Sequence, residues 1–184
     1  MVEVDRAPGI RPRPTLARRL DAAARGAVPF ATTLALVLFA GAIAGLPGEE
    51  ALRPALALCS VFAWTLLRPA LLMPPLVFLI GLLCDLLGWL PLGVATVTLL
   101  AIQGAALRLR RTLAGAGLAP SWACFAVLAA LAAGLLWALA SALSFRLLPA
   151  APALRTWGFA VVLYPSVALL ALWLSRSAAA PERA

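Results

Sequence analysis

The chain has 184 residues, is 64% hydrophobic and carries a net charge of +8, which comes from 15 arginines against seven acids. Its mean hydropathy of +1.02 leaves too little polar surface for a soluble globule of this size, which indicates an integral membrane protein. The sequence contains no histidine, which removes the commonest general base and the commonest metal ligand. We therefore expect a non-enzymatic protein without catalytic, cofactor-binding or metal-binding residues.

The N-terminal segment, residues 1–26, holds six of the arginines and three prolines and has no apolar run long enough to cross a membrane. We expect it to lie in the cytoplasm and to form a short amphipathic helix around TLARRLDAAARG. The arginines of this helix, Arg18, Arg19 and Arg25, would contact lipid headgroups. A polytopic membrane domain then covers 27–174, and 175–184 form a cytoplasmic tail.

Apolar runs predict an all-α integral membrane protein with six transmembrane helices, at 27–46, 52–67, 70–88, 91–107, 121–145 and 157–174. The second helix is short and ends at Arg68, which can reach the headgroups, before Pro69, which cannot continue a helix. Pro74 and Pro75 either kink the third helix or mark its true start. Merging the second and third helices into one span leaves five spans as the alternative.

The arginine distribution predicts the orientation in the membrane. With the N-terminus inside, the inner segments hold 12 arginines, and the outer loops hold three, Arg53, Arg146 and Arg155. This asymmetry predicts that both termini lie in the cytoplasm. The basic cluster Arg108, Arg110 and Arg111 opens a predicted polar loop, 108–120. We interpret it as a topology determinant that contacts anionic lipid, and not as a nucleic-acid site.

One carboxylate, Asp85, stands in the apolar run GLLCDLLGWLPLG, residues 81–93. Gly81, Asp85 and Gly88 are spaced i, i+4, i+7 and so share one helix face, where small residues let another backbone approach. An unpaired buried carboxylate is costly, so Asp85 needs a partner or a function.

The predicted fourth helix supplies candidate partners across a short turn. Pro91 suits the first helical position, and Gly93 and Thr96 fall at about the height of Asp85. We expect Gly93 to allow close approach and Thr96 to donate its hydroxyl. The unpaired amides near Leu92 and Gly93 are further candidate donors.

Three roles for Asp85 remain open. It can clasp the helical hairpin as a neutral, hydrogen-bonded group that Asn would replace, it can contact another membrane protein, or it can serve a proton relay. A relay needs further ionisable groups, whereas the nearby Thr98 and Gln103 are polar but not ionisable. Arg68 lies 17 residues away, about 25 Å along the helix, and is out of reach. The three outer-loop arginines could approach.

Other patterns have simpler interpretations. The tryptophans near predicted span ends are expected to be interfacial anchors: Trp64, Trp89, Trp122, Trp157 and Trp173. The three cysteines are expected to be free and buried. The G-x-x-x-G pattern at Gly41 and Gly45 is a candidate helix contact.

Residues 64–100 resemble the bacterial rod shape-determining protein MreD family. That family shows an aromatic residue before an RP pair and then a G-L-x-x-D-x-x-x-x-x-P-L-G core. Its counterparts in this sequence are Trp64, Arg68, Pro69, Gly81, Leu82, Asp85, Pro91, Leu92 and Gly93. The chain departs from the pattern at Trp89 and Leu90, where the family usually has a small residue or glycine.

The resemblance implies a non-enzymatic component of the cell-elongation complex in the bacterial inner membrane, which helps couple a cytoskeletal filament to peptidoglycan synthesis. Its implied partners are membrane-anchored MreC and, through it, MreB, RodA and an elongation transpeptidase, together with membrane lipids. No small-molecule substrate is then expected. The family also looks similar to the substrate-binding components of energy-coupling factor transporters. A vitamin-type transporter subunit is therefore the alternative, although Asp85, Trp89, Arg146 and Arg155 are nearly all the polar groups available on the outer side.

Overall fold

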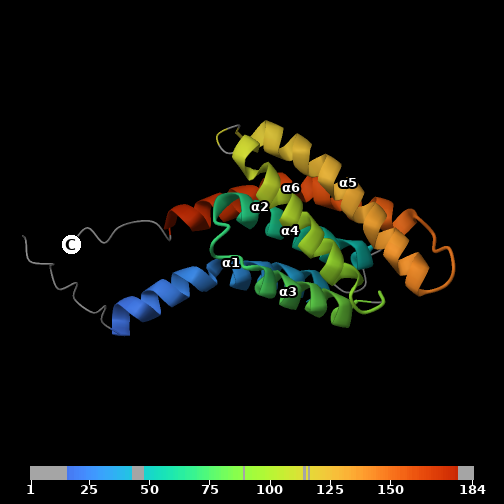
Figure 1. Ribbon diagram of the computed structural model, residues 1–184, viewed down its shortest axis with the longest axis horizontal. Helices are drawn as coiled ribbons and strands as arrows, with labels where there is room; N and C mark the ends of the chain where they lie inside the picture. The colour runs from blue at the N-terminus through green and yellow to red at the C-terminus, as the bar shows by residue number, and fades with distance from the viewer. Residues whose placement is uncertain (1–15, 43–47, 89, 114, 116, 178–184) are drawn as a thin grey trace, which may run out of the picture.

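The computed structural model describes residues 16–42, 48–88, 90–113, 115 and 117–177. Within these ranges the protein is all-helical (Figure 1). The helices are α1 (Leu16–Ala42), α2 (Glu49–Leu67), α3 (Pro74–Leu87), α4 (Val94–Leu113), α5 (Leu118–Leu143) and α6 (Ala151–Ser177).

Three of the described helices are long and apolar enough to cross a membrane: α2, α5 and α6. The apolar part of α1, Gly26–Ala42, is shorter, and α3 has only 14 residues. At 1.5 Å per residue α3 is about 21 Å long, less than the roughly 30 Å of a hydrocarbon core. α4 has 20 residues but carries three arginines in its C-terminal part.

Several predicted boundaries are wrong. The amphipathic helix and the first span are one continuous helix, α1, because Ala-rich sequence outweighs the cost of a single Gly26. The N-terminal half of α1 extends beyond the other helices (Figure 1). α3 begins at Pro74 and not at residue 70, since two prolines fit only a first helical turn. The predicted loop 108–120 is helical as far as Leu113, and α6 begins at Ala151, six residues earlier than expected.

Helix α2 is the centre of the bundle. It packs against α1, α3, α4 and α6, while α5 packs against α4 and α6. Its side chains are buried around the whole helix, which agrees with a sequence that is apolar on all sides. Phe62 of α2 meets Phe125 of α5 and Tyr164 of α6, with ring centroids 4.3–5.7 Å apart. The three cysteines are free, as predicted, but only Cys59 and Cys84 are buried, whereas Cys124 is partly exposed.

Side-chain hydrogen bonds join α1 to α2. The hydroxyls of Thr33 and Ser60 lie 2.6 Å apart and are buried, and the indole N–H of Trp64 donates to Thr32 Oγ1 at 3.0 Å. Trp64 is 2% exposed, so its prediction as an interfacial anchor is wrong. Gly41, predicted to be a helix contact, faces Arg53 of α2, since an added Cβ would lie 3.1 Å from Arg53 Nη2. Gly45, the other residue of that pattern, lies outside the described residues.

Trp122 of α5 supplies a hydrogen bond that the backbone of α6 lacks. Pro165 lies inside α6 and has no amide hydrogen, so the carbonyl of Val161, four residues earlier, loses its helical donor. The indole N–H of Trp122 donates to this carbonyl at 2.9 Å. In the opposite direction, Trp157 of α6 donates to Ala126 of α5 at 3.0 Å. These two tryptophans, about 40% exposed, thus bind a neighbouring helix.

We expect Trp122→Phe to lower the free energy of unfolding by about 1–2 kcal/mol, because it leaves the Val161 carbonyl without a donor. Trp157→Phe is the matched control: Ala126 keeps the amide of Ala130 as its helical donor, so the loss should be smaller. Unfolding of the purified protein in detergent measures both. Adding Pro165→Ala should restore an amide to α6 and reduce the cost of Trp122→Phe; equal costs in both backgrounds would contradict this assignment.

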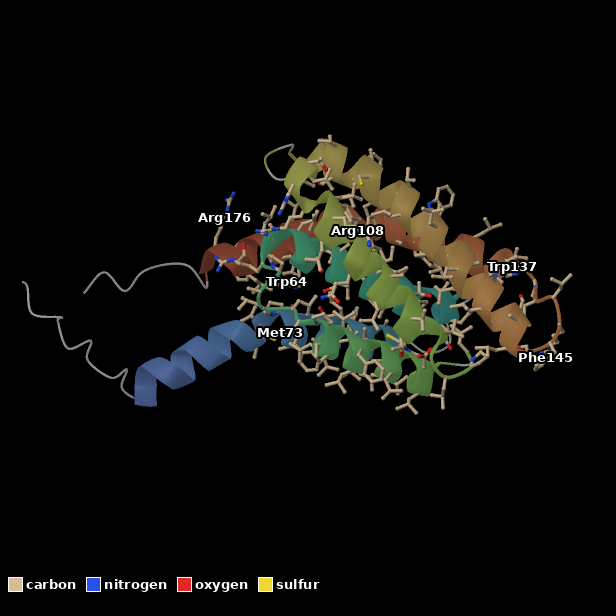
Figure 2. The ribbon with its side chains drawn as sticks, viewed as in Figure 1. Trp64, Met73, Arg108, Trp137, Phe145 and Arg176 are labelled. Atoms are coloured by element: carbon tan, nitrogen blue, oxygen red, sulfur yellow. The ribbon has the colours of Figure 1, made fainter. Side chains whose placement is uncertain are left out.

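The described charges are segregated between the two ends of the bundle. The basic end comprises Arg68, Arg108, Arg110, Arg111 and Arg176, all exposed. The hairpin end comprises Glu49, Glu50, Arg53, Asp85, Arg146 and Arg155. Figure 2 shows Arg176 at one end and Phe145, the neighbour of Arg146, at the other. Among these side chains the basic end has no acid, whereas positive and negative charges balance at the hairpin end.

Candidate functional site: the Asp85 cap of helix α4

Asp85 lies in the last turn of α3 and is 3% exposed. Its Oδ1 accepts the amide N–H of Ala95 at 2.8 Å. Its Oδ2 accepts the amides of Gly93 at 2.9 Å and Thr96 at 3.2 Å, and also the Thr96 hydroxyl at 2.8 Å. Both carboxylate oxygens are therefore used within the helical hairpin.

These donors belong to the first turn of α4 and to Gly93 directly before it, where backbone amides have no helical acceptor. The Val94 amide donates to the carbonyl of Pro91 at 3.3 Å, and Asp85 satisfies the amides of Ala95 and Thr96. In most helices the N-cap residue, which directly precedes the helix, accepts these amides with its own side chain. Here a side chain of the preceding helix accepts them, and its negative charge meets the positive end of the α4 dipole.

Gly93 has a different role from the one predicted. Its φ is +97°, a conformation that side chains with a Cβ rarely adopt, and no atom lies within 4 Å of the position of an added Cβ. Gly93 thus turns the chain so that its amide faces Asp85, and it does not mediate close packing. Pro91 precedes α4 by three residues and does not occupy the first helical position, and the amide of Leu92 is not among the donors to Asp85.

Gly81 is the position at which α3 and α4 come closest. A Cβ added there would lie 2.4 Å from Thr96 Cα and 3.0 Å from Thr96 N. The predicted close approach is therefore confirmed for Gly81. It is wrong for Gly88, which follows the last residue of α3 in an extended conformation, and where an added Cβ would meet the Cys84 carbonyl of the preceding turn.

The outer arginines do not pair with Asp85. Arg53 donates through Nη1 to the Leu87 carbonyl, and Arg155 forms an ion pair with Glu50 at 2.8 Å. All the partners of Asp85 in the described chain are thus uncharged donors. An ionised carboxylate, which only accepts, fits four donors, whereas a carboxylic acid would direct a fifth hydrogen at them.

Three arginines, Arg53, Arg68 and Arg110, each donate to a carbonyl at the C-terminal end of another helix. Arg53 of α2 donates to Leu87 of α3, and Arg110 of α4 donates to Leu66 of α2 at 3.2 Å. Arg68, just after α2, donates to Ser175 of α6 at 3.3 Å. Each places a cation near the negative end of a helix dipole. This role was not predicted, because nothing in the sequence indicates which distant carbonyl an arginine will meet.

The polar groups considered for a proton relay bind the backbone instead. The amide of Gln103 donates to the Leu72 carbonyl at 2.7 Å and so holds the loop before α3. The hydroxyl of Thr98 donates to the Val94 carbonyl of its own helix at 2.8 Å. Neither forms a hydrogen bond to Asp85, so the described residues contain no hydrogen-bonded path leading from the carboxylate toward Gln103.

A cavity of about 260 Å³ lies beside the cap at the hairpin end. Its walls are mostly apolar, with Leu136 and Leu148 among them, and its polar lining includes Arg53 and Thr156. Arg53 Nε is buried without a hydrogen-bond partner among the described residues. Of the four outer polar groups expected near a ligand, Asp85, Arg146 and Arg155 do not line this cavity, and Trp89 lies outside the described residues.

The remaining sequence-predicted residues are less constrained by the structure. The backbone of Arg18, Arg19 and Arg25 belongs to α1, while their side chains lie outside the described part of the chain. Arg108 and Arg111 are exposed near the end of α4. Pro69 directly follows Arg68, the residue that caps α2 through its own amide to Trp64 at 2.8 Å.

The fold and the site together define a helical protein with three helices able to cross a membrane and one short helix whose carboxylate caps its neighbour. No family model, curated protein or solved structure matches the chain.

Proposed function

We propose that this protein is a non-enzymatic inner-membrane component of the bacterial cell-elongation complex, as its resemblance to the MreD family implies. The observation that carries the proposal is the Asp85 cap. Gly81, Asp85 and Gly93, which belong to the quoted family core, act in one hairpin: the first sets the close approach, the second caps α4 and the third turns the chain. Such a unit supports a rigid helical surface for partner transmembrane helices.

The proposed topology has six spans with both termini in the cytoplasm. The segregated charges support it, because the basic end, with five arginines and no acid among its described side chains, matches the positive-inside rule. Because α3 is short for a full span, the proposed topology places the polar end of the α3–α4 hairpin below the outer surface of the membrane.

Co-purification tests the proposal. The tagged full-length protein, extracted in mild detergent, is expected to bring MreC with it. Recovery of transporter ATPase subunits without MreC would overturn the proposal. Asp85→Ala distinguishes folding from binding: a well-expressed variant that still recovers MreC would place the partner surface away from the cap.

A second candidate, a small-molecule binding subunit of a transporter, is favoured by the cavity next to Arg53. Its volume of about 260 Å³ is slightly below the roughly 300–1,000 Å³ of typical ligand sites. Against this candidate, all the acceptor capacity of Asp85 goes to α4, and Arg155 is paired with Glu50. Thermal melting with a panel of vitamins tests this second candidate, because a specific ligand raises the melting temperature.

A further inference from the structure

A second cavity, of about 330 Å³, lies at the opposite end of the bundle, between α2, α4, α5 and α6. Its inner wall is formed by buried residues, including Ala63, Tyr164 and Ala168. Its rim is formed by exposed residues, including Arg110, Gly117 and Leu118. The cavity is therefore mostly apolar inside, with Ser121 and Tyr164 as the hydroxyl-bearing residues of its lining, and carries a cation at its mouth. Its volume lies within the range of ligand sites.

Arg110 can bind an anion at this mouth. Its Nε donates to the Leu66 carbonyl, which fixes the guanidinium, and its two Nη groups form no hydrogen bond to the described residues. Arg108 and Arg111 lie on the same helix, and Arg68 and Arg176 at the same end of the bundle. The acids with described side chains, Glu49, Glu50 and Asp85, are all at the hairpin end. An anion at the basic end thus meets no competing carboxylate from these residues.

We propose that this cavity binds one anionic glycerophospholipid, with its phosphate at Arg110 and part of one acyl chain against Tyr164 and Ala168. A soluble anion would use the rim but leave the apolar interior empty, whereas phosphatidylcholine would fill the interior but gain less from Arg110, because its own choline cation already neutralises its phosphate. Basic pockets between transmembrane helices at a membrane surface bind such headgroups. The inference is independent of the elongation partners, since it requires only that the basic end lies at a membrane surface.

The test uses the full-length protein in detergent, to which phosphatidylglycerol or phosphatidylcholine with the same acyl chains is added. Phosphatidylglycerol is expected to raise the melting temperature saturably at lipid fractions at which phosphatidylcholine does not. Glycerol phosphate, the headgroup without chains, should give no rise. Equal rises with both lipids, or a full rise with glycerol phosphate, would overturn the proposal.

Two arginine variants separate this cavity from a general basic surface. Arg110→Gln should require roughly fivefold more phosphatidylglycerol for the same rise, the effect of one arginine at a lipid surface. Arg111→Gln removes the same charge from the same helix but does not line the cavity, and should weaken the response clearly less than Arg110→Gln. Equal weakening by both would assign the effect to surface charge alone and reject the cavity site.

A third variant tests the apolar part. Ala168→Phe fills the cavity from its inner wall and should abolish the rise with phosphatidylglycerol while the melting temperature in phosphatidylcholine stays close to the original. A filled cavity that still responds fully to phosphatidylglycerol would show that no chain enters it. If this variant does not fold, the comparison of Arg110→Gln with Arg111→Gln still tests whether the lipid binds at the cavity.

Discussion

Asp85→Ala is expected to lower the free energy of unfolding by about 3 kcal/mol or more, because it leaves three amides and one hydroxyl of α4 without their acceptor. Asp85→Asn should cost about 2 kcal/mol, since an amide can keep the oxygen that serves Gly93 and Thr96 but turns an NH₂ group toward the Ala95 amide. The measurement is unfolding of the purified protein in detergent, together with its level in membranes.

Thr96→Val provides the control for this series. It removes only the hydroxyl donor and keeps the shape of the side chain, so its cost should be about 1 kcal/mol. An Asp85→Asn protein as stable as the original would contradict the cap of four donors and favour the neutral clasp. An Asp85→Ala protein that is stable but fails to recover MreC would instead assign Asp85 to a partner surface.

Gly81→Ala is expected to cost about 3 kcal/mol or more, because its Cβ would lie 2.4 Å from the backbone of Thr96 and backbone cannot move aside as a side chain can. The two helices must separate, which also lengthens the hydrogen bonds from Thr96 to Asp85. The same unfolding measurement detects this loss.

Gly134→Ala in α5 is the matched control, since an added Cβ there meets nothing within 4 Å. It should be neutral or stabilise the protein by up to about 1 kcal/mol through helix propensity. If both substitutions had equal effects, the close approach of α3 and α4 would not be what requires glycine at residue 81.

The sequence predicted the helical class and the pairing of Asp85 with residues near the start of α4, because a lone carboxylate in an apolar run must find donors and the turn after α3 is short. The close approach at Gly81 followed from helical spacing alone. The roles of Gly93 and Pro91 could not be predicted, since they depend on the backbone angles of the turn, which no periodicity encodes.

The errors in helix ends have a common origin. Hydropathy identifies the apolar part of a helix but not its polar continuation, so the basic residues of α1 and α4 were placed outside their spans. The arginine contacts to carbonyls of other helices were equally hidden, because they join residues 34 to 107 positions apart. Pro165 indicates that the carbonyl of Val161 needs a donor from outside α6. Only the packing of α5 on α6 shows that Trp122 supplies it.

In the proposed six-span topology, the Asp85 cap also constrains how the chain enters a membrane during synthesis. α3 alone is short and exposes a carboxylate whose four donors come from residues made 8 to 11 positions later. If α3 entered lipid before those residues left the ribosome, the carboxylate of Asp85 would be buried without hydrogen-bond donors. We therefore expect α3 and α4 to insert together as a preformed pair, with translation reaching at least Thr96 before either helix leaves water.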